Sequence, residues 1–316
     1  PQPHPLLITF AELTKRVRSV KLRLLSASSA FLLERRYSLM ENWATGIFTS
    51  VSGGLGAGLE SVTELGVPTV HLHAPTTDFR TPAKTAEIKA LFASAGVAIT
   101  VVFVGFEDDD YATVERVAES VGLVPPDRRQ ARLKETLAIA DFASELGVDA
   151  IGMHLGFVSH DDPGQYSQIV EVTRSVCDHC LRNGQRFHLE TGQETADELL
   201  AFIGAVEREN LAVNFDPANM ILYGAGDPLE ALDKVGPHVK SVHCKDASIA
   251  RRPGQAWHED APLGEGDVNM EAFLRRLDGL GYRGPLTIER EYSPDQAGDI
   301  KSALTFLEGL RAKILG

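Results

Sequence analysis

The sequence predicts an α/β protein built as a single (β/α)8 TIM barrel, and two observations support this. From residue 46 onward, eight short apolar segments alternate with longer amphipathic ones, which indicates parallel strands connected by helices. The first of these strands is also not followed by the Gly-x-Gly-x-x-Gly pattern of an open dinucleotide-binding sheet, because Gly53, Gly54, Gly56 and Gly58 have a different spacing. We interpret these glycines as a loop beside a substrate site or as a plain helix entry.

The predicted strands are short apolar segments bounded by turn residues. They cover Gly46–Ser50, Thr69–His73, Ile99–Phe106, Ala150–Leu155, Arg186–Glu190, Ala212–Asp216, Val239–Cys244 and Leu286–Glu289. The clearest helical patterns cover Arg128–Leu146, Gln165–Arg182, Thr195–Arg208, Met270–Leu280 and Ala297–Lys313. Several of these helices are followed by a glycine, which supplies the left-handed conformation that ends a helix.

The first 40 residues differ from the rest of the chain. Residues 1–39 contain seven Lys or Arg against Glu12 and Glu34, which gives this stretch a local charge of +5. We predict that residues 1–40 form a basic extension outside the core fold, with a mitochondrial-type transit peptide as the alternative. The barrel is expected over residues 41–316, a length that suits one barrel of roughly 250 residues with extensions.

Composition restricts the function. The net charge of −13 leaves little positive charge to neutralise phosphates, so a nucleic-acid partner is disfavoured. Three cysteines cannot form a disulfide framework, and they favour a reducing, cytoplasmic location. No apolar run is long enough to cross a membrane.

Polar side chains gather where the predicted strands end, which is where a barrel of this type builds its active site. Six strands in the series end in a carboxylate or an imidazole. Period-two alternation places Glu190, His243 and Glu289 on the inner faces of their strands. Buried carboxylates at one barrel mouth repel one another unless a cation lies among them. Two Glu, one Asp and one His therefore predict a site for one divalent metal, Mn²⁺, Co²⁺, Mg²⁺ or Zn²⁺, rather than a soft thiolate metal.

Five ordered segments resemble the xylose-isomerase-like barrel superfamily, in particular its sugar phosphate isomerase/epimerase group. The segments are His188-Leu-Glu190-Thr-Gly, Asn214-Phe-Asp216-Pro-Ala-Asn219, Val242-His243-Cys-Lys-Asp246, Leu263-Gly-Glu-Gly266 and Leu286-Thr-Ile-Glu289. The resemblance implies that Glu190, Asp216, His243 and Glu289 hold the metal and that the two Glu are the catalytic acid and base. It also implies a small carbohydrate substrate and a possible homodimer. Asn219 departs from the pattern, because the group often has a His there.

Other polar residues near the strand ends are candidates for binding the substrate. These are His73, His154, His188, Asn219, Lys245, Arg251 and His258. The chemistry predicted from the resemblance is isomerisation or epimerisation of a ketose or sugar phosphate through an enediolate. A metal-dependent dehydratase or eliminase of a keto-sugar or keto-glycoside would use the same proton abstraction.

A second alternative is a zinc-dependent, endonuclease-IV-like DNA repair enzyme. His73 and His154 resemble two of its additional ligand positions, whereas Asn219 and the acidic charge balance disagree with it. Cys177-Asp-His-Cys180 also looks like a metal motif, but it lies within an amphipathic helix and lacks a second ligand pair.

Overall fold

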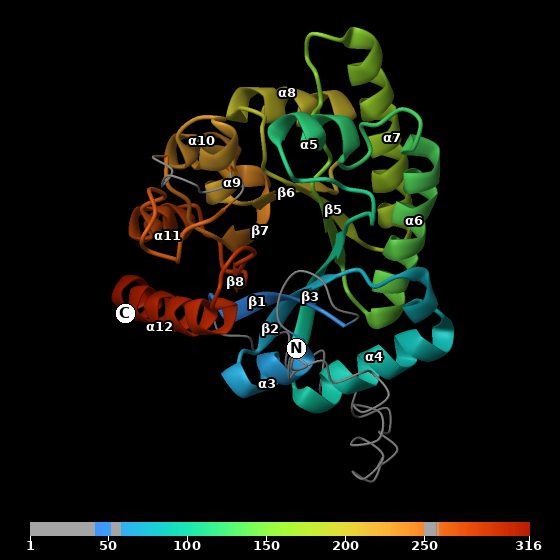
Figure 1. The fold of residues 1–316 in the computed structure, drawn as a ribbon. Coiled ribbons are helices and arrows are strands. Elements are labelled where there is room, and N and C mark those ends of the chain that lie inside the picture. The colour runs from blue at the N-terminus through green and yellow to red at the C-terminus, as the bar shows by residue number, and fades with distance from the viewer. Residues whose placement is uncertain (1–41, 52–57, 250–256, 258) are drawn as a thin grey trace, which may run out of the picture. The chain divides into compact units, whose positions relative to one another are not determined.

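The computed structural model of the chain describes residues 42–51, 58–249, 257 and 259–316. At its centre, eight parallel strands close into a barrel in which each strand pairs with the next (Figure 1). The strands are β1 (Thr45–Ser50), β2 (Thr69–His73), β3 (Ala98–Val104), β4 (Ala150–Met153), β5 (Arg186–Glu190), β6 (Leu211–Phe215), β7 (Val239–Cys244) and β8 (Leu286–Ile288). β1 pairs with both β2 and β8, which closes the barrel and confirms the predicted fold class.

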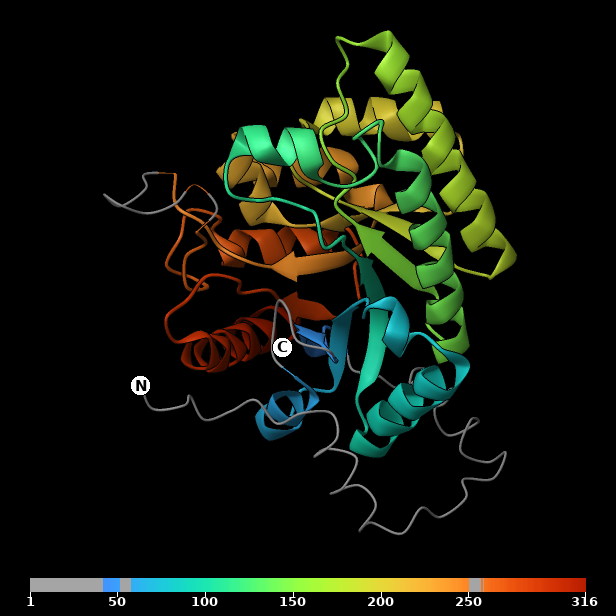
Figure 2. The same ribbon diagram turned by 45° about the vertical axis from the view of Figure 1, so that its right-hand side comes forward.

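Helices surround the barrel, as Figures 1 and 2 show from two directions. They are α3 (Leu59–Leu65), α4 (Pro82–Ala95), α5 (Val114–Ser120), α6 (Arg129–Leu146), α7 (Pro163–Arg182), α8 (Ala196–Val206), α9 (Pro217–Tyr223), α10 (Pro228–Val235), α11 (Met270–Gly279) and α12 (Gln296–Leu315). No helix in the described part of the chain combines the length and apolar character needed to cross a membrane.

Two apolar layers hold the barrel and its helices together. Phe48, Val101, Phe103 and Ala150 form a small cluster of their own, separate from the main core. The main core lies between strands and helices and includes Leu189, Phe215, Cys244 and Ile288, each next in sequence to a polar residue near the end of its strand. Because outward positions are apolar, the polar residues of the same strands face the barrel interior.

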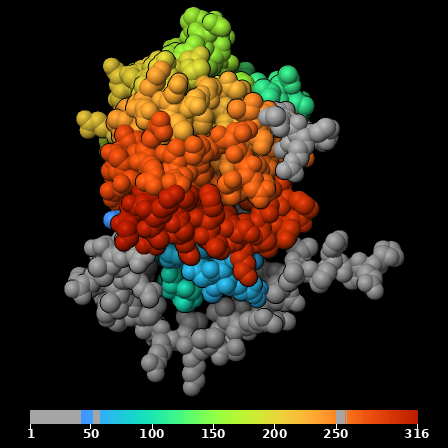
Figure 3. All heavy atoms as spheres, turned by 90° about the vertical axis from the view of Figure 1, so that its left-hand side faces the viewer, coloured from blue at the N-terminus to red at the C-terminus, as the bar shows by residue number. Residues whose placement is uncertain are grey.

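The last two helices lie against each other. Figure 3 shows the C-terminal part of the chain, coloured orange to red, gathered on one face of the molecule. Lys313 Nζ of α12 lies 2.7 Å from Glu271 Oε2 of α11, an exposed ion pair between the helices. Trp43 lies just before β1 and is fully buried. Its Nε1 donates a 2.9 Å hydrogen bond to the Tyr282 carbonyl, which connects the start of β1 to the segment before β8.

Candidate metal centre

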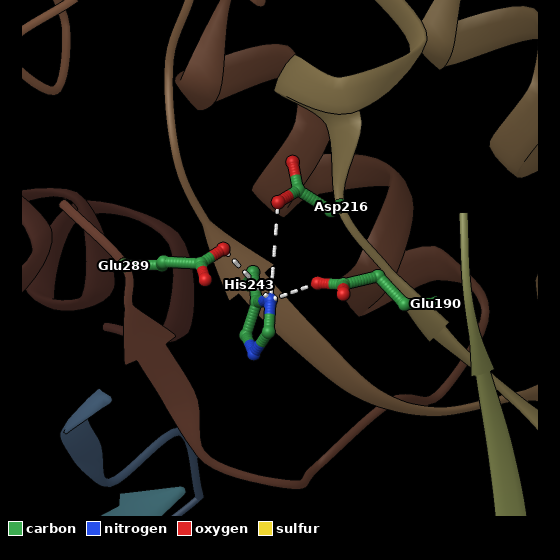
Figure 4. A group of neighbouring side chains, drawn as sticks. All are labelled: Glu190, Asp216, His243 and Glu289. Atoms are coloured by element: carbon green, nitrogen blue, oxygen red, sulfur yellow. Dashed lines mark ion pairs between the residues drawn. The ribbon is translucent and has the colours of Figure 1, made fainter. Parts of the chain in front are cut away.

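Four side chains from neighbouring strands meet at the carboxyl ends of the barrel strands. Glu190 ends β5, Asp216 follows β6, His243 lies on β7 and Glu289 follows β8. Each offers a ligand atom, and these atoms all lie within 4.8 Å of one another. In Figure 4, Glu190 and Glu289 approach the His243 ring from opposite sides, and Asp216 points at it from a third direction. The structure thus brings together the four residues that the sequence analysis named as metal ligands.

The His243 Nδ1 atom faces all three carboxylates. It lies 2.6 Å from Glu190 Oε1, 3.1 Å from Glu289 Oε2 and 3.8 Å from Asp216 Oδ2. Within the described residues, neither this nitrogen nor Asp216 Oδ2 takes part in a hydrogen bond, although both atoms are buried. Buried polar atoms without a hydrogen bond call for another partner. One nitrogen and three carboxylate groups around a common point fit a divalent cation of the Mn²⁺, Co²⁺, Mg²⁺ or Zn²⁺ type.

The electrostatics of the four residues also suit a cation. Burial alone would lower the pKa of His243, but the Glu289 and Glu190 carboxylates raise it well above its usual value. Burial raises the pKa of Glu190. Burial acts in the same direction on Glu289, yet the Lys245 ammonium and His243 hold the pKa of Glu289 well below its usual value. Three carboxylates around one imidazole form a strongly negative site, which a proton on His243 or a bound cation neutralises.

A second histidine orients the His243 ring. His71 Nδ1, on β2, lies 3.0 Å from His243 Nε2, and both rings are buried. Burial lowers the pKa of His71 well below its usual value, so its ring is neutral. We assign the His243 Nε2–H as the donor and His71 Nδ1 as the acceptor. With this hydrogen bond in place, His243 Nδ1 faces the carboxylates, and loss of its proton would free the lone pair that a metal ligand requires.

Asp216 uses its two carboxylate oxygens differently. Oδ1 accepts hydrogen bonds from the backbone N–H groups of Ala218 (2.9 Å) and Asn219 (3.1 Å), so Asp216 is the N-cap of α9. Pro217 at the first helical position favours this start. An N–H at this position has no acceptor within the helix, so a proline there loses no hydrogen bond. Capping fixes the side chain and leaves Oδ2 facing the other ligands.

Lys245 lies beside the four residues and is almost fully buried. Its Nζ is 3.4 Å from Glu289 Oε2 and 2.6 Å from Glu291 Oε2. Burial alone would lower the pKa of Lys245, but the nearby Glu289 and Glu291 carboxylates raise it well above its usual value, so the ammonium stays charged. Asp260, held by an ion pair with Arg290, adds a further negative charge nearby.

A cavity of about 270 Å³ opens onto Glu190 and Glu289. Four of the residues predicted to bind substrate line it: His73, His154, Asn219 and Lys245. His188 does not, because its ring is buried inside the barrel with Nδ1 2.8 Å from Ser241 Oγ. Arg251, His258, the loop at 52–57 and the N-terminal extension lie outside the described residues.

Three further residues lie at the site without having been predicted from the sequence: His71, Tyr111 and Tyr223. His71 precedes His73 by two positions on β2, so alternation along the strand would have placed both in the barrel interior. Tyr111 and Tyr223 line the cavity from a loop after β3 and from the end of α9. Their positions depend on how loop and helix fold back over the barrel, for which the sequence carries no periodic signal.

We expect His71→Leu to weaken Mn²⁺ binding by about 10–100-fold, because His243 loses the partner that orients its ring. His71→Asn keeps an acceptor near the position of Nδ1 and should retain more of the affinity. Titration calorimetry of the metal-free proteins with Mn²⁺ measures the difference, with circular dichroism as the check of folding. Equal losses in the two folded variants would show that the hydrogen bond does not orient the ring.

The free energy of unfolding should depend on pH through the carboxyl group of Glu194. Burial raises the pKa of its carboxyl from 4.5 to about 7. The folded state therefore holds the proton more tightly than the unfolded state, so the stabilisation is complete below pH 4.5 and is lost as the pH rises through 7. Between pH 5 and pH 8, urea unfolding of the wild type should lose about 1–3 kcal/mol more stability than Glu194→Gln. If the free energies of unfolding of the wild type and of Glu194→Gln changed equally with pH, the raised pKa of Glu194 would be contradicted.

Comparison with known proteins supports the fold. The family model of the xylose isomerase-like TIM barrel matches residues 59–310. The crystal structure of a xylose isomerase domain protein from Planctomyces limnophilus shares 50% sequence identity, with a TM-score of 0.83, and the match covers 87% of this chain and 99% of that chain. The structure of a D-tagatose 3-epimerase-like protein shares 20% identity, with a TM-score of 0.65, over 87% of this chain and 100% of that chain.

Among curated proteins, the 3-dehydroshikimate dehydratase of Pseudomonas putida is 25% identical over 210 residues, which are 64% of this chain and 31% of that protein. The matches to this and two other curated relatives span only about a third of the relatives' own lengths. The match of the family model, in contrast, extends over most of the barrel. The chain belongs to the xylose isomerase-like TIM barrel family.

Proposed function

We propose that the protein is a divalent-metal-dependent isomerase or epimerase that moves a proton on a carbon beside the carbonyl of a sugar. The observation that carries this proposal is the position of Glu190 and Glu289 on opposite sides of His243 (Figure 4), with both carboxylates lining one cavity. A substrate that enters the cavity meets both carboxylates, which reach it from two different strands. Proton transfer on two faces of one carbon requires two such groups.

The four ligand residues would hold the cation through His243 Nδ1 and one oxygen each of Glu190, Asp216 and Glu289. When bound, a divalent cation polarises a carbonyl and stabilises the negative charge that proton removal creates. One of the two Glu takes the proton from the carbon beside the carbonyl, and the other returns a proton to the opposite face, which gives an epimer. Return of the proton to the neighbouring carbonyl carbon, together with transfer of the hydroxyl proton of the first carbon to the former carbonyl oxygen, gives an isomer.

Dehydration or elimination is the second candidate, and Lys245 favours it. The buried Lys245 ammonium lines the cavity and lies 3.4 Å from Glu289 Oε2. After a carboxylate removes the proton, the C–O bond of the next carbon breaks and Lys245 donates a proton to the departing oxygen. A carbon–carbon double bond and water, or an alcohol from a glycoside, are the products. The similarity to a dehydratase supports this alternative.

The test is metal analysis of the purified protein, followed by incubation with a panel of ketoses, keto-sugars and sugar phosphates in D₂O. Deuterium incorporation beside the carbonyl, dependent on added Mn²⁺, Co²⁺, Mg²⁺ or Zn²⁺, is the expected result. An epimer or isomer supports the first candidate, and a dehydrated product supports the second. Absence of exchange with every metal, or efficient cleavage of abasic-site DNA with Zn²⁺, would overturn the proposal.

A further inference from the structure

Inside the barrel, a chain of buried polar side chains leads to Glu190. His188 Nδ1 lies 2.8 Å from Ser241 Oγ, and Ser241 Oγ lies 2.7 Å from Asn214 Oδ1. Asn214 Nδ2 lies 3.5 Å from Glu190 Oε1, which makes this contact the longest of the three. His188, Asn214 and Ser241 are all buried. Apolar side chains of the same shape would fill this space at no loss of stability, so the chain calls for a reason beyond packing.

The pairing of three strands brings these side chains together. Glu190 on β5 pairs with Asn214 on β6, and Asn214 pairs with Ser241 on β7. The register between β6 and β7 shifts by one residue just before Asn214. Without this shift, Lys240 and not Ser241 would lie opposite Asn214. An irregularity of this kind redirects a side chain, and here it places the Ser241 hydroxyl beside the Asn214 amide.

The chemistry of the groups fixes the direction of each hydrogen bond. When Glu190 holds a metal it is ionised and its oxygens only accept, so the Asn214 amide nitrogen faces Glu190 and the amide oxygen faces Ser241. The amide oxygen also only accepts, so Ser241 donates its hydroxyl proton to Asn214. The Ser241 oxygen then accepts from His188, which holds its proton on Nδ1. Every donor in the chain points toward Glu190, and hydrogen bonds aligned in this way strengthen one another.

The second ring nitrogen of His188 agrees with this direction. Nε2 is buried, and within the described residues it makes no hydrogen bond. A proton on Nε2 would form a buried N–H without an acceptor, which folded proteins rarely contain. With the proton on Nδ1, the group without a partner is a lone pair, which is tolerated more often. Both ends of the chain therefore require the Nδ1–H form of His188.

The chain ends on the oxygen of Glu190 that faces the candidate metal site. Oε1 lies 2.6 Å from His243 Nδ1, and the same atom accepts the hydrogen bond from Asn214. Carboxylates that bind metals are commonly oriented by such hydrogen bonds from neighbouring side chains. With Oε1 held among the metal ligands, Oε2 is the oxygen that can exchange a proton with a substrate.

We propose that His188, Ser241 and Asn214 are positioning residues for Glu190. Their hydrogen bonds, all in one direction, hold Oε1 on the side of the metal ligands and leave Oε2 for proton transfer. None of the three is among the described residues that line the cavity, so they act through Glu190 and not on the substrate. The role given to Oε2 rests on the proposed function, whereas the chain and its direction do not.

The position of the proton on His188 can be measured without a substrate. We would label the full-length, Mg²⁺-loaded protein with ¹⁵N-histidine and record the chemical shifts of the ring nitrogens by NMR, with His188→Gln to assign the signal. The Nδ1–H form is expected. The Nε2–H form would reverse the hydrogen bond to Ser241 and would overturn the proposal.

Asn214→Leu removes the donor to Glu190 with little change in volume. It should weaken Mn²⁺ binding about 10–100-fold in titration calorimetry and slow deuterium exchange at saturating Mn²⁺ by a similar factor. Asn210→Leu is the matched control, because Asn210 is a buried asparagine just before β6. Its Nδ2 donates to the carbonyls of Cys177 (2.8 Å) and Gln185 (3.2 Å). The control should lose stability yet bind Mn²⁺ like the wild type.

Variants of Ser241 test the middle of the chain. Ser241→Ala removes the hydroxyl that fixes the Asn214 amide, so it should weaken Mn²⁺ binding, though less than Asn214→Leu. Ser241→Thr keeps a hydroxyl and should retain more of the affinity. Circular dichroism checks that each variant is folded. Equal Mn²⁺ affinities of Asn214→Leu and Asn210→Leu, or of Ser241→Ala and Ser241→Thr, would overturn the proposal.

Failure of the positioning role can be told apart from failure of the proposed function. The Nδ1–H form of His188 and the expected losses of Mn²⁺ affinity, without deuterium exchange on any ketone, would contradict the proposed function alone. Deuterium exchange at the same rate in Asn214→Leu and Asn210→Leu, both at saturating Mn²⁺, would contradict the positioning role alone.

Discussion

Glu190→Gln and Glu289→Gln are each expected to reduce the rate of solvent deuterium exchange by about 10²–10⁴-fold. Gln keeps the size of the side chain but cannot accept a proton from carbon, so the variant loses one side of the two-carboxylate arrangement. The replaced residue is also a proposed metal ligand, so part of the loss can come from weaker metal binding. Exchange should therefore be measured at saturating Mn²⁺, with metal content determined by mass spectrometry on the same samples.

Glu308→Gln is the control for these variants, because Glu308 lies exposed on α12 away from the cavity. It should exchange at the wild-type rate. The proposed roles would be wrong if a metal-saturated Glu190→Gln or Glu289→Gln protein exchanged as fast as this control. A loss of exchange that saturating metal fully restores would assign the residue to metal binding and not to proton transfer.

Lys245→Met is expected to lower the free energy of unfolding by about 3–5 kcal/mol in the metal-free protein. Met has a similar volume but no charge, so Glu289 and Glu291 would remain buried without the ammonium that pairs with both. Urea unfolding followed by circular dichroism measures the loss. Adding Glu291→Gln to Lys245→Met should recover part of it, because one of the two uncompensated carboxylates becomes neutral.

Lys234→Met is the matched comparison. Lys234 Nζ lies 2.7 Å from Asp197 Oδ2, but both side chains are largely exposed, so this ion pair should contribute less than about 1 kcal/mol. Similar losses for Lys234→Met and Lys245→Met would contradict the assignment of Lys245 as the charge that stabilises its buried neighbours.

Much of the barrel could be predicted from the sequence because its strands are apolar and its helices amphipathic. Three strands, β2, β5 and β7, have the predicted bounds. The third predicted strand, Ile99–Phe106, is too long at its end, because the residues after Val104 leave the sheet and line the cavity. The short helices α9 and α10 were not predicted, because seven or eight residues span too few turns to show the hydrophobic period of a helix clearly.

The candidate site, too, could be predicted from the sequence only in part. Strand-end residues such as Glu190 and His243 could be identified, because parallel strands of a closed barrel all end on one side and alternation gives the facing of each residue. The hydrogen bond from His243 to His71 could not, since it depends on the distance across the barrel between β7 and β2. His188 was predicted to bind substrate because it belongs to the His188-Leu-Glu190-Thr-Gly segment. Its ring is instead buried inside the barrel against Ser241 and does not line the cavity.

The two oxygens of the Asp216 carboxylate have different contacts, and Asp216 therefore links helix α9 to the candidate metal site. One oxygen begins α9 and the other faces the metal ligands, and the same helix carries Asn219 and Tyr223 into the cavity. The first turn of α9, which includes the backbone of Asn219, is thereby anchored to the candidate metal site, whereas the cap does not involve the side chains of Asn219 and Tyr223. Replacing these two side chains can change which compound fits the cavity and leave the Asp216 oxygen in place, so the substrate range of such a barrel can change while the proposed metal ligand is kept.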